Sequence, residues 1–290
     1  MVRFPVRIML VGIAIGALAF LATSCGSSDD SQTGTEPVTG ADALYRSYLE
    51  QTAEDLVGWS ERMVDRIRSG NFSNAESPYA SARASYGQIE PVAEGFKALD
   101  HRLDASFGKA PPNQLGGFHG IEWALWNEGH RAGLVPVANR YLADVKKLQL
   151  KVRTADLDPL RITNAANKML ADASDSALRG KEDPYSHIDL VDISANVEGA
   201  QAVFETVKPL VAEKDPDLAR EIEDAFDGAY GGLRHFGYPA RDNDAPRPSA
   251  PGVAFVQYIE RTEGEFRQLG ERLDALRKPL SEVPAVITGQ

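Results

Sequence analysis

Cysteine is almost absent from this sequence: Cys25 is the single cysteine among 290 residues. One cysteine excludes an intramolecular disulfide, so packing alone must hold a folded domain together. It also excludes a metal site built from several thiolates, the ligands that soft metal ions prefer. Roughly 250 residues follow position 40, which is enough chain for a hydrophobic core in one or two domains.

Basic residues are outnumbered by acidic ones. The sequence has 31 Lys and Arg against 42 Asp and Glu, which gives a net charge of −11. Such a charge disfavours nucleic acid and anionic membrane surfaces as partners and favours the attraction of cations. Solubility alone would explain the same charge, so the balance does not by itself indicate a cation-binding function.

No apolar run in the sequence is long enough to span a membrane. The longest, Ile8–Leu21, is shorter than the ~20 residues that a transmembrane helix needs. Two arginines precede it and small residues follow it, which is the pattern of a secretory signal. Cys25 then stands where a bacterial lipoprotein carries its lipid-modified cysteine, although Ala22 replaces the more usual Leu. We therefore predict a lipoprotein signal peptide over residues 1–24.

The segment after the predicted signal peptide has the composition of a tether. Residues 25–40 are rich in Ser, Thr, Asp and Gly and lack an apolar pattern, as expected of a flexible linker. With Cys25 as the lipidation site, we expect a protein of the cell envelope that is lipid-anchored to the membrane and periplasmic or otherwise extracytoplasmic. Removal of the signal peptide, which holds two Arg and no acidic residue, would lower the net charge from −11 to −13.

Alternating strand patterns are also missing. From Ala41 onward, apolar residues recur at three- and four-residue spacing with charges between them, which indicates amphipathic helices. Proline and glycine mark the helix boundaries, and Pro91 is expected to kink or divide its helix just after Glu90. The predicted helices run from 41 to about 69, from 78 to about 96, around 119, from 136 to 152, from 159 to about 178, from 188 to 210, from 216 to about 231 and from 253 to 276.

Short connections between these helices predict the fold class. We expect an all-α protein of two antiparallel four-helix bundles, the first over residues 41–156 and the second over residues 157–290. The longest connection, Tyr238–Gly252, contains four prolines and is predicted to be a loop.

The most informative stretch contains His119 and Glu122, three residues apart in an apolar segment. On a helix these two side chains project from one face about one turn apart, a geometry that suits two ligands of one cation. Imidazole favours transition metals, and a carboxylate adds a hard oxygen and negative charge. The same spacing also arises by chance, so spacing alone leaves a purely structural role open.

Several stretches together resemble one protein family. The stretch Gly117–Glu122 fits the G-x-H-x-x-E signature of the imelysin family, and particularly its EfeO/EfeM-like branch. Three further stretches resemble that branch in the same order along the chain: Tyr79–Ala93, Ala143–Leu148 and Tyr185–Ala200. The resemblance extends from about residue 41 to residue 285.

The resemblance implies a function in bacterial iron uptake. It implies an exported, all-helical, imelysin-like protein of an EfeUOB-like system, which binds iron and passes it to a membrane iron permease, alongside a haem peroxidase. Some EfeO proteins also carry an N-terminal cupredoxin domain. Between Cys25 and Ala41 there is no room for such a domain, so we expect the shorter, EfeM-like form.

The resemblance also implies further site residues. Beside His119 and Glu122, Glu90 and Asp189 are expected to be metal ligands. For Glu90 the alternative is a charge at a helix end. Asp189 can equally cap the N-terminus of the helix that follows it.

Four more residues are expected to lie around the metal or bind a ligand: Arg83, Tyr86, His187 and Asp144. Each has a structural alternative as well. Tyr86 can be a core residue and Arg83 a surface one, His187 a loop residue, and Asp144 a surface carboxylate beside two lysines.

One imidazole with several carboxylates makes an oxygen-rich, anionic site. Such a site suits iron in either oxidation state, and zinc, manganese or copper are alternatives.

We expect a binding protein and not an enzyme, with two alternatives. A metallopeptidase of imelysin type would need an open metal position, a water and a general base, and the familiar H-E-x-x-H pair is absent from the sequence. His187 or His235 could still supply a distant ligand for such an enzyme. The second alternative is a protein that binds an anionic ligand or polysaccharide through a bridging metal.

Overall fold

The computed structural model describes residues 40–105, 107, 111–127, 130–236 and 262–289, and every regular element in these ranges is a helix. The predicted all-α class is therefore confirmed, whereas the grouping into two four-helix bundles stays a prediction. Residues Val38–Gln290 form one compact unit. Among the described helices, none combines the length and apolar character needed to cross a membrane. The predicted signal peptide, the tether with Cys25 and the loop Tyr238–Gly252 lie outside the described residues.

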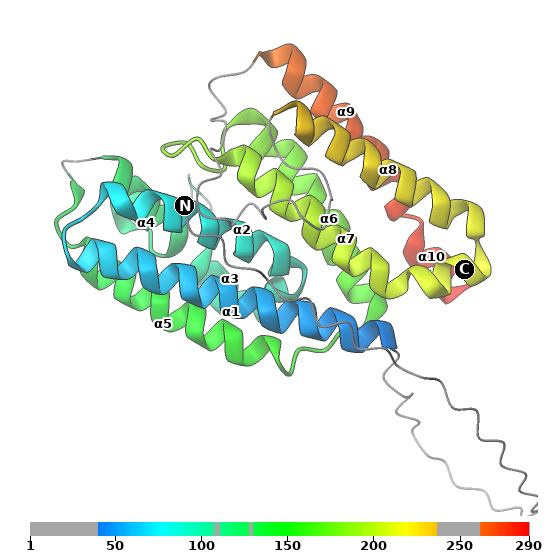
Figure 1. Cartoon of the computed structure of the whole chain (residues 1–290), viewed down its shortest axis with the longest axis horizontal. Coiled ribbons are helices and arrows are strands. Elements are labelled where there is room, and N and C mark those ends of the chain that lie inside the picture. The colour runs from blue at the N-terminus through cyan, green and yellow to red at the C-terminus, as the bar shows by residue number, and fades with distance from the viewer. Residues whose placement is uncertain (1–39, 106, 108–110, 128–129, 237–261, 290) are drawn as a thin grey trace, which may run out of the picture. The chain divides into compact units, whose positions relative to one another are not determined.

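The first half of the described chain folds into five α-helices: α1 (Gly40–Arg68), α2 (Glu76–Ala93), α3 (Lys97–Leu103), α4 (Gly117–Trp126) and α5 (Leu134–Val152). Apolar residues one or two turns apart, such as Leu49, Leu56 and Met63 on α1, are fully buried. α1 packs against both α2 and α5 (Figure 1). A buried hydrogen bond between the hydroxyls of Ser60 and Tyr141, 2.8 Å apart, fixes α1 against α5.

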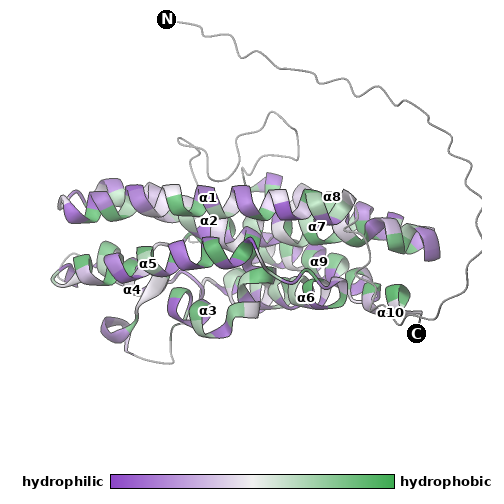
Figure 2. Cartoon of the chain, turned by 90° about the horizontal axis from the view of Figure 1, so that it is seen from below, coloured by the Kyte–Doolittle hydropathy of each residue, from purple (hydrophilic) through white to green (hydrophobic). Residues whose placement is uncertain are grey.

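The second half contributes α6 (Pro159–Asp175), α7 (Asp189–Lys214), α8 (Pro216–His235), α9 (Glu263–Leu280) and α10 (Val283–Thr288). α6 and α8 begin as their Asp-Pro pairs predict, because the Asp158 and Asp215 side chains accept hydrogen bonds from the first-turn N–H groups of Arg161 and Leu218. Along α1, α5 and α9, Figure 2 shows hydrophobic and hydrophilic residues side by side, as amphipathic packing requires.

Several predicted helix boundaries are wrong by a few residues. α2 continues through Pro91 to Ala93 and then tightens into a 3₁₀ turn, Glu94–Phe96, before α3. α5 begins at Leu134, since proline at position 136 is tolerated in a first helical turn. α9 extends to Leu280 because its buried apolar positions continue past residue 276. The predicted start of that last helix, residues 253–261, lies outside the described residues.

α2 and α7 lie side by side and position the candidate site (Figure 1). Their backbones approach so closely that a Cβ atom at Gly199 would lie 2.7 Å from the carbonyl oxygen of Gln88. Most residues of both helices are buried, including the charged residues Arg83 on α2 and Asp192 on α7. This close packing places ionisable side chains opposite one another in the interior.

Candidate metal centre

A glycine lets α4 approach the end of α3. Gly117 has a φ of +59°, and a Cβ atom there would lie 2.1 Å from the carbonyl oxygen of Leu103. Only glycine fits this combination of left-handed backbone and close approach. The contact brings His119, two residues later on α4, next to Asp104, which directly follows α3.

Four carboxylates surround the His119 ring, which is 1% exposed. Its Nε2 lies 3.4 Å from Oδ1 of Asp104 and 3.4 Å from Oε1 of Glu182. Its Nδ1 lies 3.4 Å from Oε2 of Glu122 and 3.9 Å from Oδ1 of Asp183. Although two carboxylate oxygens are near, Nε2 makes no hydrogen bond.

These residues form two groups of potential metal ligands that share His119. We call Asp104, His119 and Glu182 the outer group, and His119, Glu122 and Asp183 the inner group. In each group the ligand atoms all lie within 4.8 Å of one another. Each group offers one imidazole nitrogen and two carboxylate oxygens, a donor set that suits iron, manganese or zinc.

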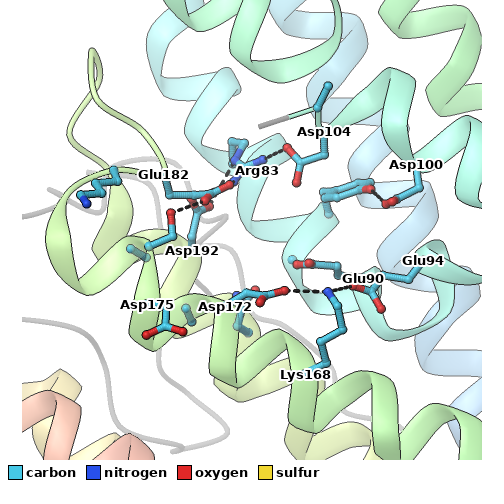
Figure 3. Close-up of a pocket in the computed structure, with 18 of the residues that line it drawn as sticks. Arg83, Glu90, Glu94, Asp100, Asp104, Lys168, Asp172, Asp175, Glu182 and Asp192 are labelled. Atoms are coloured by element: carbon cyan, nitrogen blue, oxygen red, sulfur yellow. Dashed lines mark hydrogen bonds and ion pairs between the residues drawn. The ribbon is translucent and has the colours of Figure 1, made fainter. Parts of the chain in front are cut away.

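A cavity of about 510 Å³ is lined by the two carboxylates of the outer group (Figure 3), whereas neither carboxylate of the inner group lines it. Asp104 and Glu182 line the cavity, whereas Glu122 and Asp183 are completely buried behind it. Among the residues that the structure describes, eight carboxylate side chains line the cavity, against three side chains of Lys or Arg. The carboxylates belong to Glu90, Glu94, Asp100, Asp104, Asp172, Asp175, Glu182 and Asp192. An ion that enters from the cavity therefore meets the outer group first, in a strongly anionic environment.

Arg83 is the buried cation of this region. Its Nε and Nη2 donate to the two carboxylate oxygens of Asp192, at 3.2 and 2.9 Å, and its Nη1 donates to Asp104. Burial disfavours its charge, but Asp104, Asp192 and Asp183 outweigh that effect and hold its pKa well above the usual value. One guanidinium still leaves the surrounding carboxylates in excess, so the region favours a further cation.

Protons supply part of the missing positive charge. Burial alone would lower the pKa of His119, but the Glu122 and Glu182 carboxylates beside its ring nitrogens and the charge of Asp104 raise it to about 9. Burial and the nearby charge of Asp192 raise the pKa of Asp183 well above its usual range. For Glu90, burial and the charge of Asp104 have the same effect. A metal ion at this place would compete with these protons.

The structure brings together most of the residues that the sequence singled out. His119 and Glu122 are adjacent, and Glu90, Arg83 and Tyr86 line the cavity. The hydroxyl of Tyr86 donates to Asp100. Whether any of these residues binds metal stays a prediction.

Three predicted site residues belong to neither ligand group and do not line the acidic cavity. Asp189 is buried, and its Oδ1 accepts the backbone N–H groups of residues 182 and 183. His187, in the turn before α7, has a φ of 57°. Asp144 on α5 accepts two hydrogen bonds from Arg102, at 2.8 and 3.2 Å, and one from Lys147.

Asp104, Glu182 and Asp183 were not predicted from the sequence. Glu182 and Asp183 directly precede the turn before α7, next to a stretch that the family resemblance did identify. Their position next to that stretch could have identified Glu182 and Asp183 as candidate site residues. Asp104 belongs to no recognisable motif, because its place beside His119 depends on the contact of Gly117 with the end of α3.

The chain is similar to one known protein family and to several named proteins. The family model described as imelysin matches residues 41–283. "Iron uptake system component EfeM" of Bacillus subtilis (strain 168) is 30% identical over 244 residues, which cover 84% of this chain and 60% of that protein. "Efem/EfeO family lipoprotein" of Staphylococcus haemolyticus (strain JCSC1435) is 30% identical over 249 residues, covering 84% of this chain and 82% of that protein. "Iron uptake system component EfeO" of Escherichia coli O157:H7 is 31% identical over 191 residues, covering 64% of this chain and 51% of that protein.

Proposed function

This chain belongs to the imelysin family, and from that membership and the geometry of its ligand groups we propose that it is a metal-binding component of an iron-uptake system. The observation that carries the proposal is the outer group. There, an imidazole nitrogen without a hydrogen bond faces two carboxylates at the wall of an acidic cavity. The names of the relatives, which are iron-uptake components, support iron as the cargo.

The donor set fits a cargo that must be both held and released. One imidazole and two carboxylates would give three protein ligands, and the cavity beside Asp104 and Glu182 leaves room for water or a receiving protein to supply the others. The excess of carboxylates attracts a cation into the cavity before it meets the outer group. The same donors also suit zinc and manganese, and copper binds strongly to most such sites, so selectivity for iron must be measured.

We further propose that the protein is lipid-anchored at Cys25 and delivers iron to a membrane permease, next to a haem peroxidase of the same system. The signal-like N-terminal sequence and a relative that is named a lipoprotein support the anchor. Delivery from a tethered carrier to a membrane partner keeps the local concentration of the carrier high. The permease and the peroxidase rest on the family resemblance.

The cargo role is preferred over peptide hydrolysis, although the short name of the family model labels the family a peptidase. A hydrolytic site needs a general base placed beside a metal-bound water. With Asp104 and Glu182 as ligands, Glu122 and Asp183 are the remaining carboxylates beside His119 among the described residues, and both are completely buried away from the cavity. Glu122 in particular accepts three hydrogen bonds on one oxygen.

The charge of the cavity also argues against the third alternative, an anionic chelate or polysaccharide. The eight carboxylates of the described lining, against three basic side chains, repel such a ligand. We therefore propose that the metal enters as a hydrated cation.

Calorimetric titration of the metal-stripped full chain with Fe(II), Fe(III), Zn²⁺ and Mn²⁺ tests the proposal. We expect one strongly bound ion per chain, and an affinity loss of roughly a hundredfold in both Asp104→Asn and Glu182→Gln, since each removes a ligand of the outer group. Asp144→Asn is the matched control, because Asp144 pairs with Arg102 and lies in neither ligand group. Absence of binding, or binding that survives both variants, contradicts the proposal.

The peptidase alternative is tested on the same samples. The metal-loaded chain is incubated with a denatured protein substrate, and cleavage is followed with and without chelator. We expect no metal-dependent cleavage. Cleavage that disappears in both Asp104→Asn and Glu182→Gln would replace the carrier role by an enzymatic one.

A further inference from the structure

We infer that Glu122 and Asp189 are positioning residues and not metal ligands: together they hold the segment 182–186 in place, and Glu122 orients the His119 ring so that Nε2 faces the ion. This inference rests on the proposed function. It changes the role of both residues, since the sequence alone suggests that they bind the metal directly.

One oxygen of Glu122 is fully used by the segment 182–186. Its Oε1 accepts the backbone N–H groups of Tyr185, at 3.0 Å, and Ser186, at 2.8 Å, and also the Ser186 hydroxyl, at 2.9 Å. A carboxylate oxygen has two lone pairs, so three donors leave no capacity for a metal ion. Glu122 is also completely buried and does not line the cavity.

The other oxygen of Glu122 faces the ring of His119. Oε2 lies 3.4 Å from Nδ1, on the side of the ring away from the outer group. Histidines that bind metal usually donate their second ring N–H to a carboxylate, which fixes the tautomer and the ring orientation. An Nδ1–H group directed at Glu122 leaves the lone pair of Nε2 for an ion between Asp104 and Glu182. The arrangement thus selects the outer group over the inner one.

Asp189 holds the opposite end of the same segment. From the first turn of α7, its Oδ1 accepts the backbone N–H groups of Glu182, at 3.0 Å, and Asp183, at 3.2 Å. Glu122 on α4 and Asp189 on α7 therefore fix the two ends of a segment that carries one ligand of the outer group. Without either residue, Glu182 loses its fixed position relative to His119.

The atom of His119 that binds metal decides between this inference and direct ligation by Glu122. The full chain is labelled with ¹⁵N-histidine and loaded with Zn²⁺, which is diamagnetic, and the ring nitrogens are assigned by comparison with His119→Gln. Long-range ¹H–¹⁵N correlation then shows which nitrogen binds zinc. We expect zinc on Nε2 and a proton on Nδ1.

Variants test the positioning roles separately from folding. Glu122→Gln keeps an oxygen for the segment but presents an amide to Nδ1, so we expect zinc affinity to fall about 10- to 100-fold, with loss of the Nδ1–H signal. Asp189→Ala removes the acceptor of two backbone N–H groups, and we expect zinc affinity to fall about tenfold. Asp189→Asn keeps an acceptor oxygen and should restore affinity to within about threefold of the original chain.

The possible outcomes are distinct. Zinc on Nδ1 with a proton on Nε2 overturns the inference but leaves the proposed metal-binding function intact. Zinc binding that leaves both ring nitrogens of His119 unchanged overturns the proposed function itself. The spectrum of the unmutated chain decides the question even if Glu122→Gln fails to fold.

Discussion

Arg83 on α2 and Asp192 on α7 form a two-pronged ion pair in the protein interior, with Nε 3.2 Å from Oδ1 and Nη2 2.9 Å from Oδ2. Both residues are 4% exposed. The same guanidinium also donates to Asp104 of the outer group. One side chain therefore connects the packing of the two central helices with the geometry of the candidate metal centre.

Replacement of Arg83 should destabilise the protein strongly. Arg83→Met leaves the buried Asp192 and the half-buried Asp104 without their cation, so we expect the free energy of unfolding to fall by about 3–5 kcal/mol. Arg68→Met is the control, because Arg68 pairs with Asp65 on the exposed face of α1 and should change stability by less than about 1 kcal/mol. Urea unfolding of the metal-free chain measures both. Equal losses of unfolding free energy in the two variants would show that the buried ion pair of Arg83 stabilises the protein no more than an exposed pair does.

A methyl group at Gly117 should damage both stability and metal binding. Gly117→Ala combines a left-handed backbone with a collision against the carbonyl oxygen of Leu103, so we expect a loss of more than about 2 kcal/mol. Gly133 has a φ of +85° and nothing within 4 Å of its added Cβ, so Gly133→Ala should lose only about 1 kcal/mol. Urea unfolding gives both values, and zinc titration should show weaker binding in Gly117→Ala alone. A smaller loss in Gly117→Ala than in Gly133→Ala would contradict this account.

Local patterns predicted the helices well because helix formation depends on local spacing. The Asp-Pro pairs marked the starts of α6 and α8, and the apolar spacing identified the buried face of α1. Prolines account for part of the boundary errors. Pro91 and Pro279 both lie inside helices, since packing overrides the local preference for a break.

The sequence predicted only those residues of the candidate site that belong to a recognisable motif. His119 and Glu122 stand out by their spacing, and Arg83 lies in a stretch that resembles the family. Asp104 does not, because it approaches His119 through a tertiary contact. Sequence also cannot distinguish a ligand from a residue that orients a ligand, as Glu122 and Asp189 illustrate.

The stability of the metal-free protein should fall as the pH rises from about 6.5 to about 9. The pKa of His119 is about 9 in the folded chain and about 6.5 in an unfolded one, so the folded state binds the extra proton in this window. The contribution of His119 is complete below about pH 6.5 and is lost as the pH passes through 9. The raised pKa values of Glu90 and Asp183 act in the same direction, because ionisation of these buried carboxyls also costs free energy.

Urea unfolding at about pH 6.5 and about pH 8.5 measures this dependence, and we expect a difference of about 2 kcal/mol from His119 alone. His119→Gln is the control and should show a smaller difference. Saturating Zn²⁺ should remove most of the fall, since the ion replaces the proton at pH 8.5. A metal-free protein that becomes more stable between these two pH values would show that His119 does not hold its proton in the folded chain.

Removal of Lys168 from the cavity wall should speed metal uptake. Lys168 on α6 places its Nζ 2.7 Å from Oε1 of Glu94 and 2.6 Å from Oδ2 of Asp172, so its charge opposes an incoming cation (Figure 3). Lys168→Met makes the cavity more negative by one charge, and we expect Zn²⁺ to associate severalfold faster at low ionic strength. Stopped-flow mixing measures the rate, and the gain should shrink at high salt because exposed charges are screened. Lys208→Met on α7, which removes a lysine that does not line the cavity, should leave the rate unchanged. An unchanged or slower rate in Lys168→Met would mean that ions do not reach the centre past Lys168.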